Sequence, residues 1–294
     1  MDPAFFLKIL CYATCGFIYL QQFLVRTSIV PPGSDIDLYG LNRSSHATTI
    51  FLLVLCTIYF LSLFLKKPKF STSAIIILNL IIIIIENHRS VWTSFIAAIL
   101  VFSFLVLKGK RSKIKWLFFY FLIAMVLFTS IYFTLFGESK HARYVNFMQE
   151  RFREIYMFRE LGGTATHRLN QYEYYLPLVW KDPLFGLRFR GFEIPLPPGF
   201  SYQKMSGHHF HSGYLDVLFY HGFFGLFLLF CPIVYFVIKF CKEEKHNIEN
   251  MTLFAFICSG FVFSLVYIPS FYYFAVLGIG LAFLEKREKE IHFT

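Results

Sequence analysis

Four histidines lie close together in the second half of the chain, at His208, His209, His211 and His221. Imidazole titrates near neutral pH and can therefore act as a general base, but it is also a common zinc ligand. No cysteine accompanies these histidines, and the chain has no HExxH pattern. We therefore interpret the cluster as the source of a general base and expect no bound metal.

Two arginines are candidates for holding an anionic substrate: Arg89 and Arg168. The planar guanidinium binds phosphate through two parallel hydrogen bonds, whereas lysine acts as a point charge. We expect a helix to begin near His167-Arg168, behind Gly162-Gly163 and capped by Thr164 or Thr166, and to end before Asp182-Pro183. Its free N–H groups would then add to the attraction for phosphate. For Arg89, the alternative is a side chain that reaches lipid headgroups.

Two further patterns are weaker indications of a functional site. Asp35-Ile36-Asp37 has the DxD spacing that can hold a metal-diphosphate sugar, but so short a pattern is common by chance. The six cysteines all fall in or beside apolar runs, so no disulfide framework or CxxC metal site is expected. Cys11 and Cys15 are interpreted as small residues that pack helices together.

The composition indicates that these groups are carried by a membrane protein. Hydrophobic residues make up 56% of the 294 residues, aromatic residues 21% and charged residues only 16%, well below the charged share of a soluble domain. A net charge of +10 could suggest nucleic acid. We instead expect cationic loops that flank membrane spans.

Apolar runs predict an all-α, polytopic membrane bundle. A helix needs about 20 residues to cross the hydrocarbon core. The run at 251–284 would be about 51 Å long as one helix, so we divide it at Pro269-Ser270. The result is eight predicted spans. The runs that supply them are 4–25, 47–65, 70–86, 91–107, 116–136, 213–238 and the divided run 251–284.

The loop charges predict the orientation. One set of short loops and the C-terminal tail hold 14 Lys and Arg residues, and the opposing short loops hold three. The positive-inside rule then places both termini in the cytoplasm and the long segment 137–212 in the periplasm. No cleavable signal peptide is evident. Ten of the 12 Arg but only three of the 16 Lys fall on the outer side. Either outer Arg pairs with loop acids, or it binds an anionic, phosphate-bearing substrate.

This topology divides the chain into three parts. Residues 1–136 form an N-terminal bundle of about five spans. Residues 137–212 form a periplasmic loop with amphipathic helices. Residues 213–294 form a C-terminal bundle of about three spans with a basic tail. In the loop, residues 141–159 are predicted to form a helix that carries Arg143 and lies along the outer interface or packs on the bundle.

Several of these segments resemble the O-antigen ligase/polymerase superfamily. The stretch His211-Ser212-Gly213 followed by Gly222 and Phe223-Phe224-Gly225-Leu226 resembles its HNxxL…GxxGL signature, and His209-Phe210-His211 resembles the H-x-H form seen in ligases. Upstream lie three further segments in the family's order. They are Leu38-Tyr39-Gly40-Leu41-Asn42, His88-Arg89-Ser90-Val91-Trp92, and Arg168-Leu169 with Trp180-Lys181-Asp182-Pro183-Leu184-Phe185-Gly186.

The resemblance implies a metal-independent, inverting membrane glycosyltransferase without a cofactor. Such enzymes move a glycan from undecaprenyl diphosphate to an acceptor on the periplasmic face of the bacterial inner membrane. By that resemblance His211 is the catalytic base, with His209 and Ser212 in support. Arg89 and Arg168 grip the donor diphosphate, and Arg143 is a third candidate for the same role.

Two departures from the family pattern stand out. Ser212 replaces the family's Asn after the key histidine, and the chain lacks the further N-terminal spans of longer members. We therefore expect either a compact or divergent member of the family, or a truncated gene start.

Four activities remain open. The first is transfer of O-antigen to lipid A-core in lipopolysaccharide biosynthesis, which the H-x-H form favours. The second and third are repeat-unit polymerisation and protein O-glycosylation. The fourth belongs to a different class, a transporter or flippase of a lipid-linked sugar. Transporters tend to carry ionisable groups near mid-membrane and internal repeats, and neither is evident here. No nucleic acid partner is expected.

Overall fold

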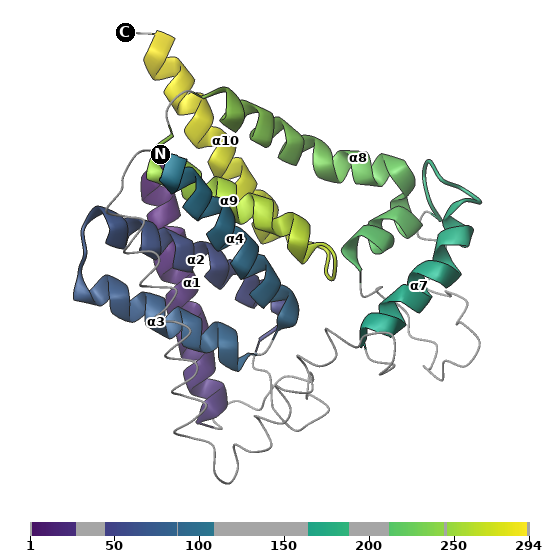
Figure 1. Ribbon diagram of the computed structural model, residues 1–294, viewed down its shortest axis with the longest axis horizontal. Coiled ribbons are helices and arrows are strands. Elements are labelled where there is room, and N and C mark those ends of the chain that lie inside the picture. Colours follow the sequence, from purple (N-terminus) through teal and green to yellow (C-terminus); the bar gives the residue numbers. More distant parts are fainter. Residues whose placement is uncertain are drawn as a thin grey trace. The chain divides into compact units, whose positions relative to one another are not determined.

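The computed structural model describes residues 2–27, 45–86, 88–108, 164–187, 212–243 and 246–292. Within these ranges the regular structure is entirely helical, which confirms the predicted all-α class (Figure 1). The described helices are α1 (Pro3–Arg26), α2 (Ala47–Lys66), α3 (Phe70–Ile85), α4 (Arg89–Lys108), α7 (Thr164–Val179), α8 (Gly213–Lys242), α9 (Ile248–Phe263) and α10 (Phe271–His292).

The helix bounds follow the predicted apolar runs closely. Helices α1 to α4 match the first four runs, and α8 covers the run that begins at residue 213. The long run at 251–284 is divided into α9 and α10, and Pro269-Ser270 lies between them as predicted. The predicted span 116–136 and the amphipathic helix 141–159 lie outside the described residues.

Four of the described helices are long and apolar enough to cross a membrane: α1, α2, α4 and α8. Helices α3 and α9 are also apolar but have only 16 residues each. These helices and their composition are those of a multi-pass membrane protein. The total of eight spans and the sidedness remain predictions.

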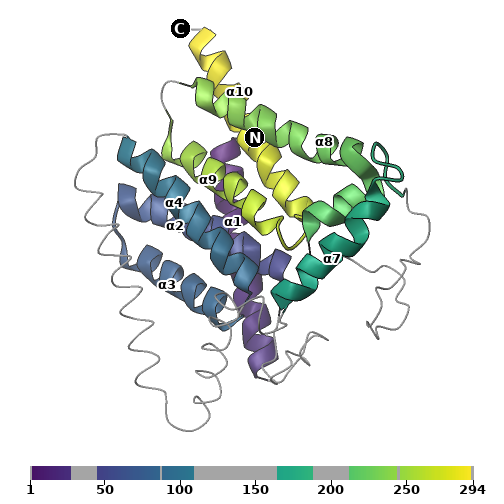
Figure 2. The ribbon, with the colours of Figure 1, turned by 45° about the vertical axis from the view of Figure 1, so that its right-hand side comes forward.

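The chain divides into two compact units, and the first comprises Met1–Lys110 and Phe227–Thr294. Helix α2 lies at its centre, in contact with α1, α3, α4 and α9, and most of its side chains are buried (Figure 2). Phe51 on α2 stacks on Phe256 and Phe263 of α9, with ring centroids 4.7 and 4.3 Å apart. Aromatic packing of this kind holds the central helix pair together.

The outer surface of this unit is strongly apolar. Phe17 and Phe23 on α1 are 63% and 60% exposed, and Leu100 and Phe104 on α4 are 63% and 67% exposed. A soluble protein rarely exposes so many large apolar side chains together. Because these residues lie on helices long enough to span a bilayer, we assign this surface to contact with lipid chains.

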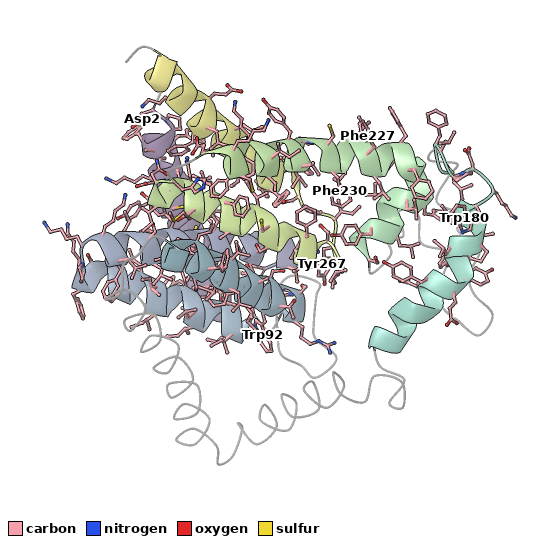
Figure 3. The ribbon with its side chains drawn as sticks, turned by 45° about the horizontal axis from the view of Figure 1, so that its top comes forward. Asp2, Trp92, Trp180, Phe227, Phe230 and Tyr267 are labelled. Atoms are coloured by element: carbon pink, nitrogen blue, oxygen red, sulfur yellow. The ribbon has the colours of Figure 1, made fainter. Side chains whose placement is uncertain are left out.

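The two chain ends meet in the first unit. Asp2 caps the start of α1, its carboxylate accepting a hydrogen bond from the backbone N–H of Ala4, and Pro3 occupies the first helical position. Lys286 Nζ on α10 lies 3.2 Å from Asp2 Oδ1 (Asp2 is labelled in Figure 3). The start of α1 and the charged part of α10 therefore lie next to each other in this unit.

The second unit, Arg111–Leu226, contains α7 and the first part of α8. Its described core consists of Tyr175 and Val179 of α7 packed against Leu215 and Phe219 of α8. Helix α8 is interrupted at Gly222, where the backbone angles are φ 63° and ψ −162°. This break divides α8 into a short first part and a second part of about 20 residues, about the length that spans a membrane.

Candidate functional site

The turn that carries Arg89 is held by a buried polar network in the first unit. Glu86, only 1% exposed, accepts a hydrogen bond from Gln22 Nε2 at 2.6 Å and another from the backbone N–H of Ser45 at 3.1 Å. His88 Nε2 lies 2.8 Å from the carbonyl oxygen of Ser45. These contacts tie the turn between α3 and α4 to the end of α1 and the segment before α2.

Two local features complete this turn. The backbone N–H groups of Val91 and Trp92 donate to the carbonyl of His88, which starts α4. The indole N–H of Trp92 reaches back to the carbonyl of Ile83 at 2.8 Å (Trp92 is labelled in Figure 3). Arg89 is the first residue of α4 and is partly exposed. The network therefore fixes the backbone of the turn from which the Arg89 side chain extends.

In the second unit, Ser212 joins α7 to the start of α8. The hydroxyl groups of Ser212 and Tyr172 are hydrogen-bonded to each other. Ser212 Oγ also accepts a hydrogen bond from the backbone N–H of Leu215 at 3.4 Å. The Ser212 carbonyl accepts one from the backbone N–H of Asp216 at 3.0 Å. Ser212 is thus the N-cap of α8, a position that serine and asparagine both favour. This accounts for a serine where the family pattern has asparagine.

Tyr175 belongs to the core that packs α7 against α8. Its ring is 1% exposed and meets Phe219 edge-on at 5.7 Å. Burial raises the pKa of Tyr175 to about 12, since the phenolate would be desolvated there. Tyr175 therefore stays neutral and serves to pack α7 on α8.

The segment after α7 is locked into the break of α8 by backbone hydrogen bonds. The N–H groups of Phe223 and Phe224 donate to the carbonyls of Pro183 and Leu184 at 2.8 and 3.0 Å. In the opposite direction, Leu187 N–H donates to the carbonyl of Phe219 at 2.8 Å. The break leaves these groups without partners inside α8, and residues 183–187 supply them.

Two glycines make this lock sterically possible. Gly186 and Gly222 both have φ of 63°, a conformation that glycine adopts most readily. A Cβ at Gly222 would lie 2.5 Å from the backbone carbon of Leu184, and one at Gly186 would lie 2.6 Å from the backbone nitrogen of Gly222. Both glycines belong to the motifs that carry the family resemblance. The structure gives these motifs an architectural role.

Aromatic side chains flank the lock. Trp180 lies 5.9 Å from Phe223, and Phe185 lies 5.7 Å from Phe224, measured between ring centroids (Trp180 is labelled in Figure 3). All four rings are exposed in part. Exposed aromatics at the start of a span are typical of the membrane interface.

The sequence prediction that Arg168 lies in the first turn of its helix is wrong. Helix α7 begins at Thr164, so Arg168 is its fifth residue. Arg168 therefore lies outside the first turn, and the helix dipole attracts anions most strongly within that turn. The sequence prediction placed the helix start near His167 because Thr164 and Thr166 are good N-cap residues, but the structure already has Thr164 within the helix.

The predicted site residues are described to different extents. Arg89 belongs to the first unit, while Arg168 and Ser212 belong to the second, where Ser212 is buried. The helix position of Arg168 is described, but not the surroundings of its side chain. Arg143, His209 and His211 lie outside the described residues.

Among the described residues, no group of three or more His, Cys, Asp or Glu side chains could hold a metal ion. The histidines at 208–211 and the pair Asp35 and Asp37 lie outside those residues. All six cysteines are free, as predicted, and Cys11 and Cys15 are buried in α1.

The supporting roles of three residues were not predicted from the sequence: Glu86, Gln22 and Tyr172. Glu86 had a visible signal, since it is the only Asp or Glu between residues 38 and 137. An acid at the end of an apolar run usually has a specific partner. Gln22 and Tyr172 had no such signal, because their roles depend on partners far away in the chain.

Comparison with known proteins identifies the family. The family model for O-antigen ligase matches residues 74–230, more than half of the chain. This range contains the α3–α4 turn, α7 and the break of α8. No curated protein matches the chain significantly. The chain therefore belongs to the O-antigen ligase family.

Proposed function

We propose that the protein is an O-antigen ligase of the bacterial inner membrane. It transfers glycan from undecaprenyl diphosphate to lipid A-core on the periplasmic face. One observation carries this proposal: the match to the O-antigen ligase family covers every predicted site residue. Those residues are Arg89, Arg143, Arg168, His209, His211 and Ser212.

The proposed reaction is a direct displacement at the anomeric carbon of the donor. His211 takes the proton from the acceptor hydroxyl as its oxygen attacks that carbon. The bond from the carbon to the diphosphate oxygen breaks, and the electron pair leaves with the diphosphate. Arg89 and Arg168 stabilise the charge that develops on the leaving group, and Arg143 is a further candidate. Attack opposite the leaving group inverts the anomeric configuration.

Several structural features support these roles. Arg89 is partly exposed on a turn braced by buried hydrogen bonds, which suits a group that must hold an anion in place. His211 directly precedes Ser212, the cap of α8. The predicted base therefore stands next in sequence to a residue that is fixed at a helix start.

A deletion strain tests ligation against polymerisation. Without the gene, lipopolysaccharide should carry bare core, and complementation with wild type but not with His211→Ala or Arg168→Ala should restore the full glycan. Equal membrane levels of each variant are the control. Core bearing a single repeat in the deletion strain would instead assign the protein as the repeat-unit polymerase. Full complementation by both variants would remove the site assignment.

Chelation tests the absence of a metal. Because guanidinium groups neutralise the leaving diphosphate in this mechanism, purified protein should keep its transfer rate in excess EDTA. Loss of activity that returns with a divalent cation would contradict the mechanism and direct attention to Asp35 and Asp37.

A further inference from the structure

The hydroxyl pair of Tyr172 and Ser212 connects two parts of the chain that are 40 residues apart. Ser212 is only 1% exposed, and the Tyr172 side chain is partly buried. A buried hydroxyl must be hydrogen-bonded, and each of these satisfies the other. The pair is therefore a specific contact between α7 and the chain as it enters α8.

The contact fixes the first turn of α8. Ser212 caps that turn through Leu215, whose side chain is fully buried in the core of the second unit. An N-cap residue sets the angle at which the preceding chain enters the helix. Here the preceding residue is His211.

The other end of the contact lies on the helix that carries Arg168. Tyr172 follows Arg168 by four residues, one helical turn, within α7. The hydrogen bond between Tyr172 and Ser212 thus links α7, which carries the predicted diphosphate-binding residue Arg168, to the residue that follows the predicted base in the sequence.

We propose that Tyr172, through Ser212, is a positioning residue for glycan transfer: it holds the start of α8, which directly follows the predicted base in the sequence, against the helix that carries Arg168. This inference rests on the proposed function. Proton transfer requires the base within about 3 Å of the acceptor hydroxyl, and small displacements lower the rate without weakening substrate binding. The contact therefore acts on the chemical step and leaves donor affinity unchanged.

Tyr172→Phe tests this directly, because it removes only the hydroxyl and keeps the ring that packs on the core. Ser212→Gly removes the partner hydroxyl, and glycine is among the replacements that weaken a serine N-cap least. Tyr174→Phe is the matched control, since it makes the same chemical change on another face of α7. All are measured as purified protein in lipid nanodiscs, with a lipid-diphosphate glycan donor and a lipid A-core acceptor.

In Tyr172→Phe and in Ser212→Gly, kcat should fall about three- to tenfold while KM for the donor stays at the wild-type value; the thermal midpoint should fall only slightly, so that both variants remain folded at the assay temperature. The double variant should be no slower than the slower single variant, because both changes break one contact. Tyr174→Phe should keep the wild-type kcat.

Wild-type kcat in Tyr172→Phe, or a loss in Tyr174→Phe equal to that in Tyr172→Phe, would overturn the inference. Additive losses in the double variant would do the same. If Ser212→Gly fails to insert, Tyr172→Phe and its control still decide the question. His211→Ala separates the two levels. If it is inactive while Tyr172→Phe is normal, only the positioning role fails; if it is fully active, the proposed function of the site fails.

Discussion

At the scale of single residues, Glu86 is the clearest case of a buried charge with a structural purpose. It is 1% exposed and accepts from both Gln22 and the backbone of Ser45. A buried carboxylate is stable only when its oxygens are hydrogen-bonded. These bonds join three segments of the first unit directly beneath Arg89.

Glu86→Ala should therefore destabilise the protein. The change leaves the Gln22 amide and the Ser45 N–H without their acceptor, at a cost of about 1–3 kcal/mol for each buried group left unsatisfied. The thermal midpoint in detergent should fall by several degrees. Glu285→Ala, which removes an exposed carboxylate on α10, is the control and should leave the midpoint unchanged. Equal midpoints for the two variants would show that the network does not hold the turn.

The candidate site residues could be predicted from the sequence, but the residues that contact and support them could not. Arg89 and Ser212 were identified because charge and motif position mark them. Their supporting partners were not, because Gln22 is 64 residues from Glu86 and Tyr172 is 40 residues from Ser212. Such pairs are set by the packing of helices, which periodicity along one segment does not reveal.

At the scale of elements, the central feature is the lock between residues 183–187 and the break of α8. Helix starts and ends were predicted to within a few residues, since apolar runs and charged ends mark them. The break at Gly222 was not predicted, because a glycine inside an apolar run is compatible with a continuous helix. Only the backbone of the docked segment reveals why the helix stops there.

Gly222→Ala and Gly186→Ala should each disrupt the lock. Both positions have positive φ, which costs a non-glycine residue roughly 1–2 kcal/mol, and each added Cβ would meet backbone atoms at 2.5–2.7 Å. Thermal midpoints should drop well below wild type, and transfer activity should fall with them.

Gly278→Ala on α10 is the matched control, because a Cβ there meets nothing within 4 Å. It should be neutral or slightly stabilising, since alanine favours a helix over glycine. Should Gly222→Ala behave like Gly278→Ala, the close approach of the two segments would be contradicted.

At the scale of the whole molecule, the composition and loop charges predicted a multi-pass helical membrane protein, and the described helices agree. Asp2 at the start of α1 and Lys286 on α10 form an ion pair within the first unit. Sidedness itself depends on the lipid bilayer and the membrane potential, so it remains a prediction from charge.

Cysteine labelling tests this topology. In a background with the native cysteines replaced by serine, Lys181→Cys should react with a membrane-impermeant maleimide when only the outer membrane is permeabilised. Lys67→Cys should react only after the inner membrane is opened as well. Both native side chains are exposed, so burial does not limit either reaction. Labelling of Lys67→Cys before the inner membrane is opened would invert the predicted orientation.

The central claim is that the chain itself transfers glycan, with His211 as base and no metal. The most direct measurement is transfer by purified protein in nanodiscs, from an undecaprenyl diphosphate glycan to lipid A-core, in the presence of EDTA. Wild type should form product with inverted anomeric configuration, and His211→Ala should form less than about one hundredth as much, the usual scale of general-base catalysis. Product formation by His211→Ala at the wild-type rate, or no product from folded wild type, would contradict the account.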